Sequence, residues 1–291
     1  MKIGIIASDQ AEWHVQRLLS ELKERSIDAY LLPVTKFKAN IGSDPKISVK
    51  GYGIDDYDAV VVRRVPGGSV EQVIYRMDAL FRLEELGVKV VNSAKSIEKT
   101  VDKYMTSALL EEAGILTPRT VVTESFTEAI KAYEKLGGDV VVKPLFGSLG
   151  LGMTRVSSRD VAYRVFRALE MTNSVYYIQE FISHPGEDLR IFMVGGSAIA
   201  SMRRVAKGWK TNISGGGKAQ SYTPSDEIIE TSVKASNILG LTYTGVDIIV
   251  SETGEPYVIE LNSTPGWRGL QSVNRVNIAG ALIDHVLETL K

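Results

Sequence analysis

Apolar runs alternate with segments of helical periodicity along the first third of the chain. The runs are typical of buried strands, and they lie at residues 2–7, 29–34, 58–64 and 88–92. Between them, residues 11–25 can place Trp13, Leu18 and Leu22 on one helical face. A second helix is predicted over 70–86, before Gly87, a residue that commonly ends helices. Strands that alternate with helices predict a parallel sheet covered on both faces.

The pattern changes after the first third. Ser96 is expected to open a helix that runs to Gly114. Further helices are predicted over 127–136, 158–171, 226–239 and 277–290. Strands are predicted over 139–144, 175–182, 188–196, 197–205, 244–250 and 256–262. Residues 206–221 form a glycine-rich polar loop in this prediction.

Composition narrows the class of protein. The 291 residues are enough for two or three lobes, and 44% apolar with 24% charged residues is ordinary for a globular protein. A net charge of −1 provides no broad positive field for nucleic acid or anionic lipid. The chain has no cysteine and only three histidines, which argues against disulfides, a thiol nucleophile and a zinc cluster. No apolar run is long enough to span a membrane, so we expect a cytoplasmic protein.

Two carboxylates stand in a predicted hairpin near the end of the chain. Thr253-Gly254 separates two apolar runs, which favours a two-residue turn. Such a turn would place Asp247 directly opposite Glu260, with Asn262 on the same face. Opposed carboxylates repel, and burial makes this costly unless a cation offsets their charge. The three oxygen ligands suit Mg²⁺ or Mn²⁺; the alternatives are a slipped register or one protonated acid.

Lys143 ends a buried apolar run and is followed by a glycine-rich loop at 147–152. Gly147, Ser148 and Gly150 belong to this loop, whose backbone N–H groups could approach phosphate closely. The loop lacks the Gly-Lys-Ser/Thr ending of a Walker A loop and the spacing of the dinucleotide fingerprint. A phosphate-binding loop and a plain hairpin turn therefore both remain open.

Other polar residues interrupt the apolar pattern where a ligand could bind. Gln179 and Glu180 break an apolar strand, and they could offer backbone groups to an adenine edge or simply mark the strand end. The basic loop over 206–221 could close over phosphates, or it could be only a solvated loop. Arg63 ends a parallel strand, where open α/β sheets commonly place ligands.

Taken in order, these segments resemble the ATP-grasp superfamily and, more narrowly, the RimK-type amino-acid ligases. The matching segments span essentially the whole chain: 101–118, 140–153, 177–182, 188–196, 210–219, 245–249 and 258–271. The resemblance implies an ATP-grasp fold of mixed α/β and α+β class. It would have a parallel α/β pre-ATP-grasp domain over 1–95 and a first ATP-grasp lobe with a glycine-rich lid over 96–183. A metal-binding lobe over 184–291 would complete it, with ATP held between the two α+β lobes.

The resemblance also implies roles for individual residues. Arg203 would be catalytic, steadying the transferred phosphate, and Asp247, Glu260 and Asn262 would hold two Mg²⁺ or Mn²⁺ ions. Within the nucleotide-binding set, Glu180 and Phe181 would form the adenine hinge. That set is Lys103, Lys143, Gly147, Ser148, Gly150, Gln179, Glu180, Phe181, Asp188, Lys210, Thr211 and Asn212.

The reaction that the resemblance implies is an ATP-dependent ligation through an acyl-phosphate, releasing ADP and phosphate. Segments 120–130 and 262–279 look most like archaeal ligases that add α-linked glutamate to tetrahydromethanopterin. We therefore expect L-glutamate as the amine donor, with Arg63 or Arg268 as the cationic partner of its second carboxylate. The acceptor would be a pterin-type cofactor or a protein C-terminus. A homo-oligomer is expected, and neither nucleic acid nor membrane is expected as a partner.

Three alternatives stand beside this interpretation. The first is a ligase acting on a ribosomal protein or on an amino-group carrier protein; the run 263–266 argues against the carrier-protein ligases. The second is a nucleotide-binding regulator without chemistry, which the intact carboxylate set and Lys143 disfavour. The third is a dinucleotide-dependent oxidoreductase, but residues 7–10 lack the glycine fingerprint after the first strand.

Overall fold

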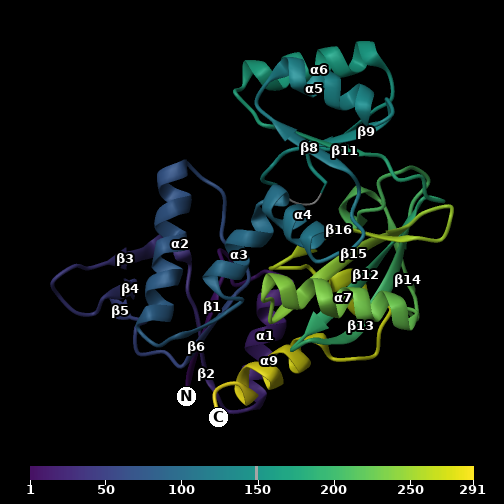
Figure 1. Ribbon diagram of the computed structural model, residues 1–291. Helices are drawn as coiled ribbons and strands as arrows, with labels where there is room; N and C mark the ends of the chain where they lie inside the picture. The colour runs from purple at the N-terminus through teal and green to yellow at the C-terminus, as the bar shows by residue number, and fades with distance from the viewer. Residues whose placement is uncertain (148–149) are drawn as a thin grey trace.

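The computed structural model describes residues 1–147 and 150–291, which fold into three parts (Figure 1). The N-terminal part contains a parallel sheet of order β2-β1-β6-β7. Its strands are β1 (Lys2–Ile6), β2 (Asp28–Leu31), β6 (Ala59–Val62) and β7 (Lys89–Val91). The helices between them are α1 (Trp13–Glu24) and α2 (Val70–Glu85). The predicted parallel α/β arrangement is confirmed, and Gly87 does follow α2 with a positive φ.

A small antiparallel sheet lies beside this domain and is absent from the sequence prediction. It consists of β3 (Phe37–Ala39), β4 (Ile47–Val49) and β5 (Tyr52–Gly53), after a 3₁₀ turn η1 (Val34–Lys36). Strands of two or three residues are too short for apolar periodicity to reveal them. The predicted strand over 29–34 also ends early, because η1 begins within it.

The single helix predicted over 96–114 is in fact two helices, α3 (Ala94–Val101) and α4 (Lys103–Glu112). Ser93, not Ser96, caps α3, since its hydroxyl accepts a hydrogen bond from Ser96 N–H at 3.1 Å. Asp102 has extended backbone and caps α4 with its carboxylate. The break therefore places Lys103 at the first residue of α4.

The middle part is an antiparallel sheet of order β10-β9-β11-β8, with two helices on one face (Figure 1). The strands are β8 (Thr120–Thr123), β9 (Val140–Lys143), β10 (Thr154–Val156) and β11 (Tyr176–Glu180). The helices are α5 (Phe126–Lys135) and α6 (Arg159–Met171). Residues such as Tyr133, Phe166 and Ile178 form a core that belongs to this part alone.

The C-terminal part is a five-stranded antiparallel sheet of order β14-β13-β12-β15-β16. Its strands are β12 (Glu187–Val194), β13 (Ser197–Val205), β14 (Lys218–Ser221), β15 (Tyr243–Val250) and β16 (Pro256–Asn262). Its helices are η2 (Ile213–Gly215), α7 (Asp226–Leu239), α8 (Arg268–Gln271) and α9 (Ile278–Glu288). The segment predicted as one loop over 206–221 thus contains a helical turn and the edge strand β14.

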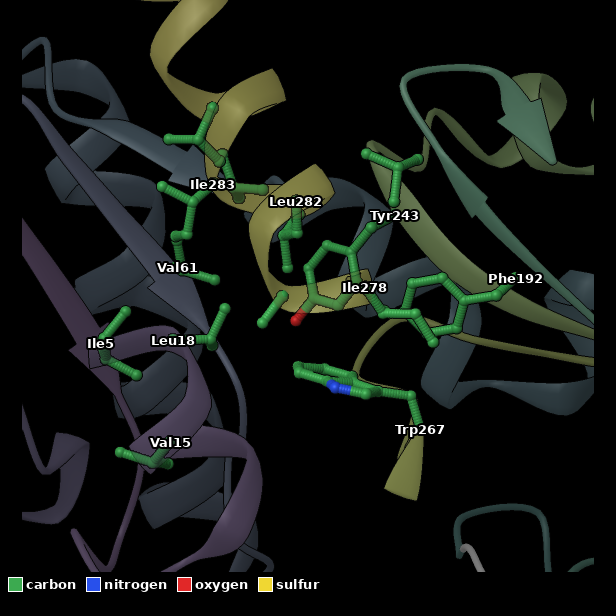
Figure 2. Packing of buried hydrophobic residues seen from close by; sticks show 14 of the residues in the cluster. Ile5, Val15, Leu18, Val61, Phe192, Tyr243, Trp267, Ile278, Leu282 and Ile283 are labelled. Carbon is green, nitrogen blue, oxygen red and sulfur yellow. The ribbon is translucent and has the colours of Figure 1, made fainter. Parts of the chain in front are cut away.

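The N-terminal and C-terminal parts share one hydrophobic core (Figure 2). Ile5 and Leu18 meet Tyr243, Trp267 and Ile278 in a single buried cluster. The two parts are therefore packed as one body, while the middle part has its own core.

Asn92, at the end of β7, joins the same two parts through hydrogen bonds. Its side-chain Nδ2 donates to the carbonyl oxygens of Tyr243 and Ser263, at 2.7 and 2.6 Å. Its Oδ1 accepts from the N–H groups of Thr242 and Tyr243. Because Asn92 is fully buried, these bonds fix the end of β16 against the parallel sheet. The domain limits at residues 95 and 183 stay a proposal.

Across both described ranges, no helix combines the length and the apolar character needed to cross a bilayer.

Candidate active site

The two carboxylates singled out in the sequence lie on neighbouring strands of the C-terminal sheet. Asp247 on β15 is paired with Glu260 on β16, and Gly245 is paired with Asn262. Side chains two residues apart on a strand share a face, so all three polar side chains lie on one side of the sheet. The absence of a side chain at Gly245 also leaves room for Pro265, since an added Cβ would lie 3.2 Å from it.

The hairpin reaches this pairing by a different route from the one predicted. The loop occupies residues 251–255, and Ser251 N–H donates to the carbonyl oxygen of Glu255. The register shifts by one residue next to Asp247, so that Ile248 pairs with Val258 and Ile259 is left over as a bulge. The predicted two-residue turn at Thr253-Gly254 is therefore wrong. The longer loop and the bulge offset each other and restore the Asp247–Glu260 pair.

Asp247 is neutralised by two arginines of the chain itself. Arg190 donates from Nε and Nη2 to the two carboxylate oxygens at 2.7 and 2.6 Å, and Arg204 Nη2 lies 3.0 Å from Oδ2. Burial opposes ionisation, but the charges of Arg190 and Arg204 outweigh it and lower the pKa of Asp247. The sequence argument considered only a metal ion as the neutralising charge, and it missed Arg190.

Arg204 also pairs with Asp188, one of the residues expected to bind nucleotide. Arg204 Nε donates to Asp188 Oδ1 at 2.6 Å, and both side chains are buried. Arg203, the residue expected to be catalytic, lies elsewhere. Its guanidinium contacts Glu187 and Gln220, and it does not line the nucleotide pocket described below. Neighbouring residues of a strand point to opposite faces, so the structure brings Arg204 to the site in place of Arg203.

Glu260 faces two lysines. Burial and the charge of Asp247 raise the pKa of Glu260, while Lys103 and Lys143 act in the opposite direction. Lys143 Nζ donates to Gln179 Oε1 at 2.6 Å, and burial lowers the pKa of Lys143 to about 8. Lys103 Nζ reaches the carbonyl oxygens of Leu145 and Gly147, at 3.2 and 3.0 Å. Lys103 thus contacts the start of the glycine-rich loop and Lys143 contacts Gln179, while the charges of both lysines act on Glu260.

A pocket lies between the middle sheet and the C-terminal sheet. Apolar side chains such as Val141, Met153 and Ile249 form part of its lining. The polar residues that line it are Lys143, Gln179, Glu180, His184, Asp188, Arg204, Lys210, Thr211, Asn212, Asp247 and Glu260. Most of the nucleotide-binding residues expected from the sequence therefore converge on one pocket. An apolar cleft with a charged lining suits a nucleotide, whose base is apolar and whose phosphates are anionic.

The hinge strand leaves one backbone donor for a base. The N–H groups of Glu180 and Phe181 already donate to the carbonyl oxygens of Arg119 and Asp139. The Glu180 carboxylate is also engaged, because it accepts from the backbone N–H and the Nε of Arg119 at 2.7 and 2.6 Å. In the described part of the chain, Ile182 N–H makes no hydrogen bond, and Ile182 lines the pocket. The free donor at the hinge therefore belongs to Ile182.

Aromatic side chains surround the hinge. The Arg155 guanidinium lies over the Phe181 ring at 3.5 Å, and Trp209 meets the same ring edge-on at 6.3 Å. Trp209 lines the pocket from the loop after β13, and Lys210 lies over its ring. The sequence analysis did not single out Trp209. An aromatic residue beside a lysine in a glycine-rich loop is the signal that could have found it.

The glycine-rich loop and the loop before β14 contact each other over the pocket. Lys210 Nζ donates to the Met153 carbonyl oxygen at 2.6 Å. A Cβ added to Gly150 would lie 2.8 Å from Asn212 Oδ1, so the two loops approach closely at this glycine. β9 and β10 are antiparallel neighbours, so this loop is also a hairpin connection. Gly147 lies at its start, and Ser148 falls outside the described residues.

Arg63 and Arg268 both lie next to Trp267, Arg63 over its ring and Arg268 as the following residue of the chain. Arg63 is 4% exposed, its guanidinium lies 4.6 Å from the Trp267 ring, and Nη1 donates to the Tyr243 hydroxyl at 3.3 Å. Its nearest carboxylate is Glu12, at 3.9 Å. Arg268 is exposed and forms no ion pair with any described residue. Neither arginine is among the residues that line the nucleotide pocket.

Glu260 and Asn262 fit an oxygen-binding divalent ion, and Asp247 lies beside them, held by Arg190 and Arg204. Within the described ranges, no group of three or more His, Cys, Asp or Glu side chains is placed to hold a metal. The expected set instead combines two carboxylates with the Asn262 amide. No hydrogen bond to a described residue occupies the side chains of Glu260 or Asn262. Unengaged carboxylate and amide oxygens are ligands that suit Mg²⁺.

Residues that line or support the site but are absent from the predicted set include Arg190, Arg204, Trp209 and Ile182. Arg190 lies two residues after Asp188 on β12, and it pairs with Asp247 across the β12–β15 ladder. The period of two along a strand could have placed Arg190 on the face of Asp188. The role of Ile182 depends on which backbone groups are already bonded, which only the strand pairing reveals.

Comparison with known proteins agrees with this geometry. Residues 1–97 match the RimK PreATP-grasp domain, and residues 100–286 match the RimK-like ATP-grasp domain. The chain belongs to the RimK-like ATP-grasp family. It is therefore an ATP-dependent ligase that joins a carboxyl group to an amino acid, as the sequence analysis expected.

Relatives of known name cover the whole chain. The tetrahydromethanopterin:α-L-glutamate ligase of Methanococcus maripaludis is 34% identical, over 100% of this chain and 99% of its own. The probable α-L-glutamate ligase of Aliivibrio fischeri is also 34% identical, over 99% of this chain and 96% of its own.

Solved structures share the fold at lower identity. A RimK domain ATP-grasp protein from Sphaerobacter thermophilus has a TM-score of 0.79 and 20% identity, covering 99% of this chain and all of its own. The ATP-grasp ligase PsnB, complexed with a minimal precursor, has a TM-score of 0.78 and 24% identity, covering 99% and 98%.

Proposed function

We propose that this protein is an α-L-glutamate ligase, which joins the amino group of L-glutamate to an acceptor carboxylate and releases ADP and phosphate. The observation that carries the proposal is the convergence of Lys143, Arg204, Asp247 and Glu260 on one pocket. Two of these side chains offer positive charge for phosphates, and two offer carboxylate oxygens for an ion. Two relatives that match the whole chain are named as α-L-glutamate ligases, one of them as probable.

Each residue of the pocket has a proposed role in binding the base, the phosphates or the ion. The base enters against Phe181 and Trp209, and Ile182 N–H donates to its edge. Lys103 and Lys143 hold phosphate oxygens, while Lys210, Thr211 and Asn212 close over them and exclude water. Asp247, Glu260 and Asn262 would hold Mg²⁺, which offsets phosphate charge when bound.

Phosphoryl transfer then depends on position and charge. The acceptor carboxylate attacks the γ-phosphate, and Arg204 stabilises the charge of the transferred group in place of Arg203. The glutamate amine attacks the resulting acyl-phosphate, and phosphate leaves. No nucleophilic side chain is needed, in keeping with a chain that has no cysteine.

The second carboxylate of glutamate needs a cation, and Arg63 and Arg268 are the proposed partners. Arg268 is exposed with no ion pair to a described residue, and Arg63 has only a distant carboxylate at 3.9 Å. Both lie next to Trp267, a residue of the segment that follows Asn262. The name of the Methanococcus maripaludis relative favours a pterin-type cofactor as acceptor; a protein C-terminus is the second candidate.

The test is a screen by mass spectrometry. The protein is incubated with ATP, Mg²⁺, mixed amino acids and a panel of candidate acceptors that includes a pterin cofactor and peptides with free C-termini. The proposal expects a mass gain of one glutamate residue on one acceptor, together with ADP. Addition of a different amino acid would refute the glutamate assignment, and ATP binding without any product would favour the regulator.

A further inference from the structure

A groove lies outside the nucleotide pocket, between α4, the segment after it and the edge strand β8. Its volume is about 630 Å³, and residues that line it include Tyr104, Ile115, Leu116, Thr120 and Val122. Tyr104 and Leu116 are exposed apolar side chains. The groove meets the nucleotide pocket only at Pro118, which lines both.

The edge of β8 has unpaired backbone groups that face this groove. β8 is the last strand of its sheet and pairs only with β11. Because Glu180 N–H donates to the Arg119 carbonyl oxygen, the backbone groups of Arg119, Val121 and Thr123 face β11. Those of Thr120 and Val122 must then face away from it, and these are the two β8 residues that line the groove.

The charge of the groove is negative. Glu111 and Glu112 line it, are exposed and form no ion pair with a described residue. They lie at the C-terminal end of α4, where the helix dipole adds partial negative charge. The one cation in the lining is Arg119, and its guanidinium is already paired with Glu180 at 2.6 Å.

We propose that this groove binds an extended basic peptide segment, which adds as a further strand to the free edge of β8. Backbone N–H and C=O groups at Thr120 and Val122 would pair with the peptide backbone, as in other proteins that extend a sheet with a bound strand. Alternate apolar side chains of the peptide would pack against Tyr104 and Leu116, and lysine or arginine would face Glu111 and Glu112.

A second copy of the chain fits the same edge less well. Two copies paired edge to edge through β8 would bring Glu111 and Glu112 of each near the same acids of the other, and like charges across an interface disfavour association. Peptide binding at this groove is also independent of the ligase reaction, because it can be measured without ATP.

The experiment measures fluorescence anisotropy with a labelled hexapeptide of alternating lysine and valine. Val122→Pro removes the outward N–H without touching the bonds to β11, and Val122→Ala is the matched control that keeps the N–H. We expect saturable binding that weakens about tenfold or more in Val122→Pro and less than about threefold in Val122→Ala. Replacing lysine by glutamate in the peptide, or Glu111 and Glu112 by glutamine, should weaken binding in the same way.

The same experiment can overturn the proposal. Absence of saturable binding would do so, and so would equal binding of a peptide whose alternate backbone nitrogens are methylated. Sedimentation of the protein alone tests whether the edge of β8 joins two copies of the chain. A dimer that Val122→Pro dissociates would assign the edge to a second copy of the chain instead of a peptide.

Discussion

The guanidinium of Arg190 donates to both carboxylate oxygens of Asp247, across the pair of strands β12 and β15. Asp247 in turn is the direct cross-strand neighbour of Glu260. Two carboxylates therefore stand side by side, one held by arginine and the other facing Lys103 and Lys143. The arginine keeps Asp247 ionised and in place, so an ion bound at the proposed site would meet a carboxylate that is already positioned.

Loss of the Arg190 guanidinium should therefore destabilise the fold. In Arg190→Met we expect the free energy of unfolding to fall by about 3 kcal/mol, because a buried carboxylate loses two hydrogen bonds. Urea denaturation measures the effect. Arg203→Met is the control, since Arg203 is partly exposed and its pairs should contribute less than about 1 kcal/mol. Equal losses in the two variants would contradict this assignment.

The loop over the nucleotide pocket depends on one close backbone approach. A Cβ at Gly217 would lie 2.1 Å from the Thr211 carbonyl oxygen and 3.0 Å from that of Asn212, so backbone must move. Gly217→Ala should raise the KM for ATP by about tenfold or more, because Thr211 and Asn212 are displaced. Gly215→Ala is the matched control, since nothing lies within 4 Å of its added Cβ. Similar KM values in both variants would show that the loop does not position the nucleotide.

Trp209 should report nucleotide binding. The base is expected to enter beside Trp209 and Phe181, so ATP should change the tryptophan fluorescence. In Trp209→Phe the signal should disappear while affinity stays within about threefold, and Trp209→Ala should weaken binding by about tenfold. An unchanged signal in Trp209→Phe would assign the fluorescence change to Trp13 or Trp267 instead.

His14 should make stability depend on pH. Its Nδ1–H donates to the Glu12 carboxylate at 3.2 Å, and its Nε2 accepts from the backbone N–H of Trp267 at 3.0 Å, so the ring is held neutral. Burial, with the charges of Arg63 and Arg268, lowers the pKa of His14 to about 4 from the ordinary 6.5. Between pH 4 and pH 6.5 the unfolded chain therefore binds more protons than the folded chain. The stability from His14 is complete above pH 6.5 and is lost as the pH falls toward 4.

The measurement compares wild type with His14→Gln in urea at several pH values. Other groups titrate in both proteins, so the difference in unfolding free energy isolates His14. This difference should be constant above pH 6.5 and should shrink below it. A difference that stays constant down to pH 4 would show that the ring is not held neutral.

The carboxylate pair was predictable because strand periodicity is strict. A strand register that pairs Asp247 with Glu260 puts both side chains on one face of the sheet. The apolar residues around them restrict which registers are possible. The turn was not predictable in the same way, since a five-residue loop and a bulge give the same pairing as a two-residue turn. The helix break at Asp102 was missed because its capping carboxylate competes with a continuous helical pattern.

The arginines that neutralise Asp247 and the free N–H at the hinge could be identified only from the tertiary structure. Arg190 and Asp247 are far apart in sequence and meet only through the β12–β15 ladder. Arg203 and Arg204 are adjacent, and only the orientation of strand β13 shows which of the two side chains points into the site. The choice of Ile182 at the hinge depends on bonds that Arg119 and Asp139 make with the two residues before it. Short strands such as β8 and β10 also gave no pattern to detect.

Calorimetric titration of ATP, with and without Mg²⁺, tests the central claim most directly. Glu255→Gln is the control, since it removes an exposed carboxylate from the same hairpin. Wild type and Glu255→Gln should bind ATP markedly more tightly with Mg²⁺, and Glu260→Gln should lose this gain, because a neutral amide is a poorer ligand for the ion. If Glu260→Gln keeps the wild-type response to Mg²⁺, the carboxylate pair is not the ion site and the proposed chemistry has no centre.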